Sequence, residues 1–100
     1  MLIAHVHFSV AAGERQKALD TLLAETPAVR AMKGCQAFIP FLDATDSESL
    51  GVLHEWDCAE DFAAYTSSPG FAEVGKVLRP MMTAAPVSRR FDATLLQTVN

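Results

Sequence analysis

The sequence predicts a single α+β domain over residues 1–100, with a ferredoxin-like β-α-β-β-α-β order and helices on one face of an antiparallel sheet. Two observations lead to this fold class. The chain has 100 residues, half of them hydrophobic, which is the size of one domain with a small core. Segments with strand-like alternation and segments with helix-like spacing follow one another in that order.

The first half of the chain is predicted to form a strand, a helix and a second strand. Leu2–Val10 alternates apolar and polar residues, as a strand does. An amphipathic helix opens at Glu14, and Pro27 is expected to break its hydrogen bonding or to start a short extra turn. Gly34 ends this region, and Cys35–Asp43 is predicted to be a strand that is apolar on both faces.

The second half opens with the return strand of a hairpin, Leu50–Asp57. Asp57 followed by Glu60 three residues later has the form of a capping box for a helix. Ser68 and Pro69 give a second start signal, with serine as the N-cap and proline in the first turn. We therefore expect a helical region with two starts.

The last strand is predicted over Val87–Thr98, after Pro80 has ended or kinked the preceding helix. Arg89 interrupts an otherwise apolar face of this strand. An arginine in such a place must pair with a carboxylate, such as that of Glu55 or Asp92, or meet an anionic ligand atom. Arg89 is therefore a candidate for the site, with the ion pair as the alternative.

Both faces of the predicted sheet are apolar enough to need cover. The second strand is apolar on both sides, and Ile3 is apolar on the side of the first strand that carries His5 and His7. We expect two sheets to pack together as a homodimer, with a monomer that exposes these residues as the alternative. The sequence does not fix which face His5 and His7 occupy.

Charge and cysteine usage exclude several classes of partner. The net charge is −4 and the eight Lys and Arg residues are scattered, so we expect no nucleic-acid partner. No basic leader and no apolar run of about 20 residues is present, so we expect a cytoplasmic protein without a membrane partner. Cys35 and Cys58 have no metal-binding spacing, and no nucleotide-binding motif occurs; we therefore expect no metal and no cofactor.

The candidate chemistry lies on the return strand of the hairpin. His54 and Trp56 are two residues apart, so their side chains point to the same face as Val52. If that face looks toward the helices, an imidazole and an indole line one cavity, covered by Phe62 and Tyr65, which could hold a flat apolar ligand. The alternative is a core tryptophan, a histidine near the rim and plain core packing for Phe62.

Three short runs carry a resemblance to a known family: Gly34-Cys35, Leu53-His54-Glu55-Trp56 and Ser67-Ser68-Pro69-Gly70-Phe71. With these runs the chain resembles the antibiotic-biosynthesis-monooxygenase family. That resemblance implies dimers packed sheet to sheet, in the arrangement called a dimeric α+β barrel, and a pocket between sheet and helices. It also implies oxygenation of small aromatic or quinone-like molecules without flavin, metal or haem, with an active-site tryptophan at the position of Trp56.

The resemblance therefore implies a cofactor-independent monooxygenase that uses dioxygen on a small aromatic, quinol or polyphenol substrate. His54 would be the base or a hydrogen-bond partner of the phenolate, Trp56 would position the ring or dioxygen, and Arg89 would stabilise the oxyanion. The residues expected to bind the substrate are Val52, Phe62, Tyr65 and Phe71.

The chain departs from the family pattern at several positions. Val52 stands where the monooxygenases have an asparagine, and Tyr65 and Gly70 stand where many members have histidines. Gly75-Lys76 occupies the region of the axial histidine of the haem-degrading branch. Two alternatives stay open: an isomerase or tautomerase that uses His54, and a non-catalytic dimeric module that binds an apolar ligand.

Overall fold

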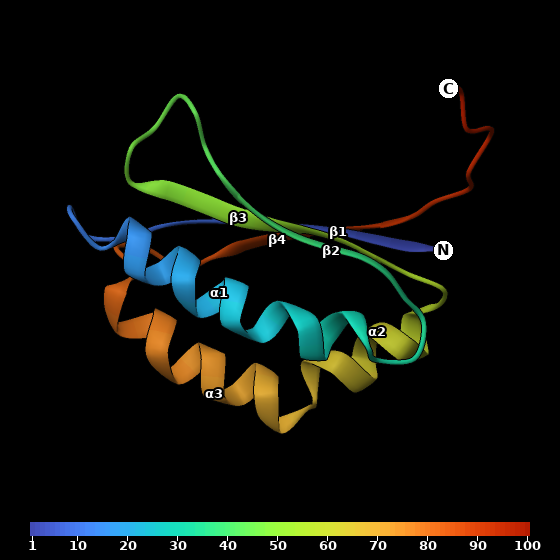
Figure 1. Cartoon of the computed structure of the whole chain (residues 1–100), viewed down its shortest axis with the longest axis horizontal. Helices are drawn as coiled ribbons and strands as arrows, with labels where there is room; N and C mark the ends of the chain where they lie inside the picture. Colours follow the sequence, from blue (N-terminus) through green and yellow to red (C-terminus); the bar gives the residue numbers. More distant parts are fainter.

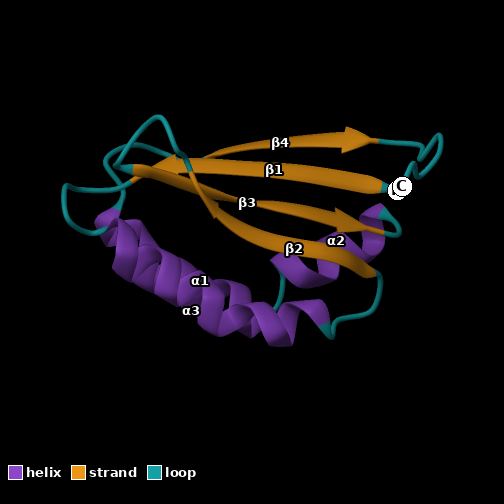
Figure 2. Ribbon diagram, turned by 45° about the horizontal axis from the view of Figure 1, so that its top comes forward, coloured by secondary structure: helices purple, strands orange, loops and turns teal.

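The computed structural model describes residues 1–100 and shows one four-stranded antiparallel sheet, in the order β2-β3-β1-β4, with the helices on one face (Figures 1 and 2). The elements are β1 (Leu2–Ser9), α1 (Arg15–Arg30), β2 (Cys35–Leu42), β3 (Ser49–Trp56), α2 (Ala59–Thr66), α3 (Pro69–Leu78), the 3₁₀ helix η1 (Arg79–Met81) and β4 (Val87–Asp92). The predicted ferredoxin-like α+β fold is confirmed. None of the helices is long and apolar enough to cross a membrane.

Helix α1 continues through Pro27, so the proline neither ends the helix nor starts a separate extra turn. A proline inside a helix removes one backbone hydrogen bond and strains the preceding turn. Here both sides of the proline are held against the sheet, because Leu22 and Val29 are buried in the core. Beyond the proline, Arg30 Nε donates to the carbonyl oxygen of Phe38 on β2 at 3.1 Å. Tertiary packing therefore keeps the last turn helical.

The two starts of the second helical region are confirmed, but one cap differs from the prediction. Helix α2 has Cys58 as its N-cap, without a side-chain cap bond. Asp57 is not the cap, because its Oδ1 accepts a hydrogen bond from Gln36 Nε2 at 2.6 Å instead. Ser68 caps α3 as expected, since its Oγ accepts from the backbone N–H of Phe71 at 3.2 Å.

The last strand is shorter than the predicted range 87–98. Its partner is β1, and the pairing reaches the end of that strand where Leu2 lies opposite Asp92. Beyond that pair, only Met1 and Ala93 bond to each other: Ala93 N donates to the carbonyl oxygen of Met1 at 2.8 Å, and the N-terminal amine of Met1 donates to the carbonyl oxygen of Ala93 at 2.8 Å. Beyond it the chain has no strand to pair with, which ends β4. Pro80 lies in η1 directly after α3 ends, as expected.

The core lies between the sheet and the helices, on what we call the inner face of the sheet. Alternate strand residues point there, and Trp56 and Phe38 are 0% and 1% exposed. The buried hydrophobic residues are Ala4, Phe8, Val10, Ala18, Leu22, Val29, Phe38, Leu50, Val52, Trp56, Phe62, Tyr65, Leu78 and Met81.

The opposite side, which we call the outer face, has no helix over it (Figure 2). The strand register lines up Ile39, Leu53, His5 and Arg89 in one row across all four strands. The flanking rows carry Ala37, Glu55, Ile3 and Phe91 on one side and Phe41, Gly51, His7 and Val87 on the other. His5 and His7 therefore occupy the outer face.

Candidate functional site

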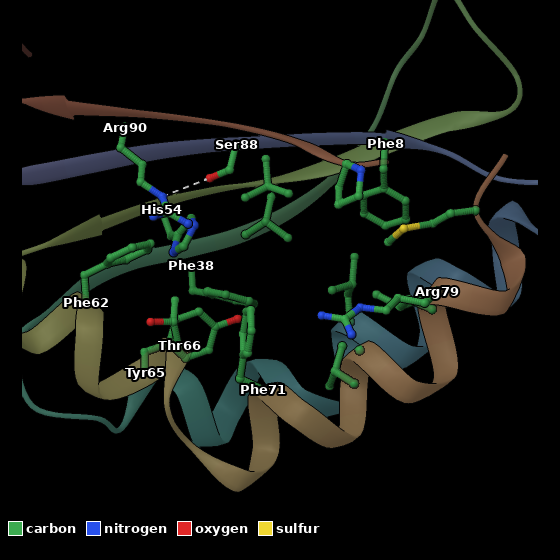
Figure 3. Close-up of a pocket in the computed structure, with 18 residues that line it drawn as sticks. Phe8, Phe38, His54, Phe62, Tyr65, Thr66, Phe71, Arg79, Ser88 and Arg90 are labelled. Atoms are coloured by element: carbon green, nitrogen blue, oxygen red, sulfur yellow. Dashed lines mark hydrogen bonds between the residues drawn. The ribbon is translucent and has the colours of Figure 1, made fainter. Parts of the chain in front are cut away.

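A cavity of about 220 Å³ lies between the inner face of the sheet and helices α2 and α3 (Figure 3). Most of its lining is apolar, and six polar or charged side chains interrupt this lining. The sheet contributes His54, Ser88 and Arg90, and the helical side contributes Tyr65, Thr66 and Arg79. None of the 18 lining residues is an aspartate or a glutamate.

The strand register places His54 and Arg90 in the same row of the inner face, with Ala4 of β1 between them. Because the alanine side chain is a single methyl group, the longer side chains on either side can approach each other over it. Figure 3 shows the Arg90 side chain extending to the His54 ring at one end of the cavity. Arg90 Nε donates to Ser88 Oγ at 3.3 Å, and its guanidinium carbon lies 4.8 Å from the centre of the Phe62 ring. No carboxylate forms an ion pair with Arg90.

The imidazole of His54 is held by Trp56, its neighbour two residues along β3. The indole Nε1 lies 2.9 Å from His54 Nδ1, and the histidine is only 2% exposed. An indole N–H can only donate, so Nδ1 must be the acceptor. A neutral imidazole with an accepting Nδ1 carries its proton on Nε2. The Trp56 bond thus fixes the tautomer, and His54 Nε2 is a donor.

His54 Nε2 is buried and has no hydrogen-bond partner in the chain. Burial, together with the positive charge of Arg90 and of His5, lowers the pKa of His54 from 6.5 to about 4. At neutral pH the ring is therefore neutral and offers one N–H to the cavity. Since Nε2 already carries a proton, this geometry favours the predicted role of a hydrogen-bond partner of a phenolate over the role of a base.

Tyr65 adds a second neutral donor from helix α2. Burial raises the pKa of its hydroxyl to about 12, with further contributions from the charges of Glu25 and Cys35. The hydroxyl therefore stays protonated at neutral pH. Its ring stacks on Trp56, with 5.3 Å between the ring centres, and meets Phe71 edge to face at 5.3 Å. These contacts hold the phenol in the aromatic wall of the cavity.

Most of the predicted site residues come together in this cavity. The lining includes the five predicted residues Val52, His54, Phe62, Tyr65 and Phe71. Trp56 is not among the lining residues; it lies behind His54 and reaches the cavity only through the hydrogen bond to that ring. Trp56 therefore acts on a bound molecule through the tautomer that it imposes on His54.

Arg89 does not lie at the cavity, and its expected place there is wrong. Its register partner is His5 on the outer face, and its guanidinium carbon lies 5.2 Å from the centre of the Phe91 ring. The arginine of β4 that lines the cavity is the next residue, Arg90, because adjacent strand residues point to opposite faces. The Arg89-Arg90 pair in the sequence signalled that one arginine would face each way, but not which. Arg79 and Ser88 carried no signal in the sequence.

The comparisons with known proteins agree with this architecture. The family model described as antibiotic biosynthesis monooxygenase matches residues 1–76. The chain belongs to this family. No curated protein matches it.

Solved structures show how widely the family fold is shared. A candidate antibiotic biosynthesis monooxygenase from Deinococcus radiodurans has a TM-score of 0.90 at 18% identity, covering 100% of this chain and 99% of that one. One from Nitrosomonas europaea has a TM-score of 0.89 at 13% identity, with coverages of 95% and 100%. A conserved protein of unknown function from Bacteroides thetaiotaomicron has a TM-score of 0.82 at 21% identity, with coverages of 90% and 94%. At these identities the likeness shows the fold.

The chemistry available to this family member is that of an oxyanion site in an aromatic pocket. A neutral N–H from His54, the guanidinium of Arg90 and the hydroxyl of Tyr65 can all donate to an oxygen atom, and no carboxylate opposes a negative charge there. No three His, Cys, Asp or Glu side chains come together as metal ligands. The expectations that the protein uses no metal and no cofactor stay predictions.

Proposed function

We propose that the protein is a cofactor-independent monooxygenase that acts on a small aromatic, quinol or polyphenol substrate. The observation that carries this proposal is the buried His54 Nε2, which has no hydrogen-bond partner, beside Arg90, which has no carboxylate partner. A buried donor without a partner costs about 1–3 kcal/mol. A phenolate oxygen in the cavity would accept from both groups and recover that cost.

These two donors would favour the deprotonated form of the substrate over its neutral form. The hydroxyl proton leaves to solvent, since His54 Nε2 already carries its own. The resulting phenolate, whose charge is shared with a ring carbon, passes one electron to dioxygen, and the two radicals combine at that carbon. With an anthrone, one oxygen atom becomes the new carbonyl and the other leaves as water with the two methylene hydrogens. The methylene carbon supplies all four electrons, so no further reductant is needed.

Oxygen uptake tests this proposal. Dissolved oxygen is followed with a panel of reduced naphthoquinones and anthrones, against the spontaneous rate of each compound. We expect the wild-type protein to accelerate uptake and Arg90→Met and His54→Gln to lose most of the acceleration. Arg89→Met is the matched control, because that arginine lies on the outer face and should keep the activity. Uptake at the spontaneous rate across the panel would contradict the proposal.

An isomerase or tautomerase is the second candidate, because the same donors would stabilise any enolate and none of them is specific for dioxygen. It differs by needing no oxygen. Under anaerobic conditions in D₂O, an isomerase would exchange the α-hydrogens of a small keto compound faster than buffer alone. Saturable binding without exchange or oxygen uptake would instead indicate the third candidate, a non-catalytic ligand-binding module.

We also propose that two copies pack through their outer faces as a homodimer. This face has no helix over it and carries exposed apolar side chains, including Val87 at 58% and Ile39 at 46% exposed. Sedimentation velocity should show a dimer for the wild type and a monomer for Ile39→Glu, which buries a charge in the proposed contact. Glu48→Gln, in the loop before β3, is the control. A wild-type monomer at micromolar concentration would reject this assembly.

A cytoplasmic location is proposed on the state of the cysteines. Cys35 and Cys58 are both free thiols, which is the common state in a reducing compartment. Fractionation of the native host, with the protein followed by antibody, tests this expectation.

A further inference from the structure

We infer that the cavity has a second anion-binding end at Arg79, so its ligand is an aromatic oxyanion that carries a carboxylate at the end remote from that oxygen. This inference rests on the proposed function, which places the oxyanion at His54 and Arg90. It adds the charge and shape of the substrate, which the oxygenase proposal leaves open.

Arg79 reaches the cavity from a different element and a different end than Arg90. It lies in η1, directly after α3, whereas Arg90 lies on β4. Figure 3 shows the Arg79 side chain entering the cavity from the end opposite to His54 and Arg90. Both arginines line the cavity, and apolar residues such as Val74 and Val52 lie in the lining as well. The cavity is therefore an apolar slot with a cation at each end.

Neither arginine forms an ion pair with a carboxylate of the chain. The ion pairs of the structure are His7 with Asp43 and Lys76 with Glu73. Acidic residues outnumber Lys and Arg by twelve to eight, yet none of them lines the cavity. A positive pocket in a protein of net charge −4 does not follow from overall composition. It is the electrostatic complement of a ligand with negative charge at both ends.

The position of Arg79 after α3 also stabilises the helix, since a cation near a helix C-terminus is favourable. That effect does not require the guanidinium to enter the cavity. A Cβ placed at Gly75 would lie 3.8 Å from Arg79 Nε and 3.9 Å from its Cζ, so the arginine folds back over the bare backbone of α3. Gly75 itself lines the cavity. The side chain is exposed and lies beside this part of the cavity lining, where its planar fork can hold a carboxylate through two bonds.

Isothermal titration with two matched ligands tests the inference. The cavity of about 220 Å³ suits small ligands, so the probes have two rings: 6-hydroxy-2-naphthoate and 2-naphthol, which differ only in the remote carboxylate. We expect the wild type to bind the naphthoate at least about tenfold more tightly, as a charged hydrogen bond permits. Arg79→Gln should abolish this preference and leave 2-naphthol affinity unchanged, while Arg79→Lys should retain part of it.

Lys76→Gln is the matched control. It removes the same charge from α3, one turn before Arg79, at a residue that is exposed and does not line the cavity. The preference should survive in this variant. Equal affinity for the two ligands in the wild type, no binding of either, or an equal loss in Lys76→Gln would each overturn the inference.

The two proposals fail separately. Accelerated oxygen uptake with an uncharged quinol, together with no preference for the carboxylate, would reject the second anion site and leave the oxygenase intact. A carboxylate preference that depends on Arg79, without oxygen uptake, would support the site and reject the oxygenase.

Discussion

The two faces of the sheet are built from the same four strands and differ in what covers them. On the inner face, the row of Phe38, His54, Ala4 and Arg90 meets helices and a cavity. On the outer face, no helix covers the neighbouring row of Ile39, Leu53, His5 and Arg89. A one-residue step along a strand therefore separates the candidate chemistry from the proposed contact surface.

This difference shows that apolar composition alone does not mark the core. Both faces carry large apolar residues, but only the inner one borders a cavity lined by a histidine with an unpaired nitrogen and by two arginines without a carboxylate partner. The inner face is specified by packing against the helices, and the outer face is available for a second copy. Substitutions at adjacent positions should consequently have very different effects.

The largest effect is expected from Phe38→Ala compared with Ile39→Ala. Phe38 is 1% exposed and Ile39 is 46% exposed. Truncating the buried Phe38 should lower the free energy of unfolding by about 3–5 kcal/mol. Truncating the exposed Ile39 should lower it by about 1 kcal/mol or less in the monomer. Guanidinium denaturation at several protein concentrations measures both. Similar costs at high dilution would contradict the assigned faces.

The next effect is a loss of stability in mild acid that depends on His54. Its folded pKa of about 4 lies below its ordinary 6.5, so the unfolded chain binds the proton first as the pH falls. The stability contributed by the neutral ring is complete above pH 6.5 and is lost toward pH 4, on the order of 3 kcal/mol in all. Urea titrations at a series of pH values across this range measure the slope of the free energy of unfolding against pH.

Two variants assign that slope to the inner histidine. His54→Gln should flatten it, because glutamine does not titrate. His5→Asn removes only the smallest of the three causes that lower the pKa of His54, so it should leave most of the pH dependence in place. A slope that follows His5 rather than His54 would show that the acid sensitivity arises from the outer face.

Gly51→Ala should destabilise the protein by about 1–3 kcal/mol through overpacking on the outer face. A Cβ at Gly51 would lie only 2.0 Å from the backbone carbonyl oxygen of Val6 and 2.7 Å from the Phe41 ring. The ring can turn, but the backbone oxygen cannot, so β1 and β3 must separate locally. Thermal unfolding monitored by circular dichroism measures the change. Glu55→Ala on the same face of β3 is the control and should shift the midpoint little.

The smallest effect is on ligand binding rather than stability. Arg90→Met should weaken binding of 2-naphthol by about tenfold, because a charged donor to the oxygen is lost. It should also raise the pKa of His54, since the Arg90 charge contributes to lowering it. Arg89→Met should do neither. Calorimetry measures the affinity, and proton NMR of the histidine ring measures the pKa. Equal behaviour of the two variants would contradict the placement of Arg90 at the cavity and Arg89 on the outer face.

The sequence predicted the inner set on β3 correctly, because alternation places Val52, His54 and Trp56 on one side and the resemblance identified Trp56. It failed at Arg89 and Arg90 for a physical reason. Alternation separates the two faces of a strand but does not say which one meets the helices, and here both faces are apolar. Only the pairing of β4 with β1 resolves it.

The remaining differences arise from contacts between distant segments. Gln36 donates a hydrogen bond to the Asp57 carboxylate, and the end of β1 determines where β4 stops. The tautomer of His54 depends on a hydrogen bond that a sequence pattern shows only as proximity along one strand. Such features follow from three-dimensional placement and carry no local signal.

Trp56 is the only tryptophan in the chain, and it is fully buried behind the cavity in contact with Tyr65 and His54. Its indole N–H is already committed to the histidine. Its fluorescence therefore comes from a single known place and should report both protonation of His54 and filling of the cavity. The protein carries a built-in optical probe of its own site, and no label needs to be attached to follow binding there.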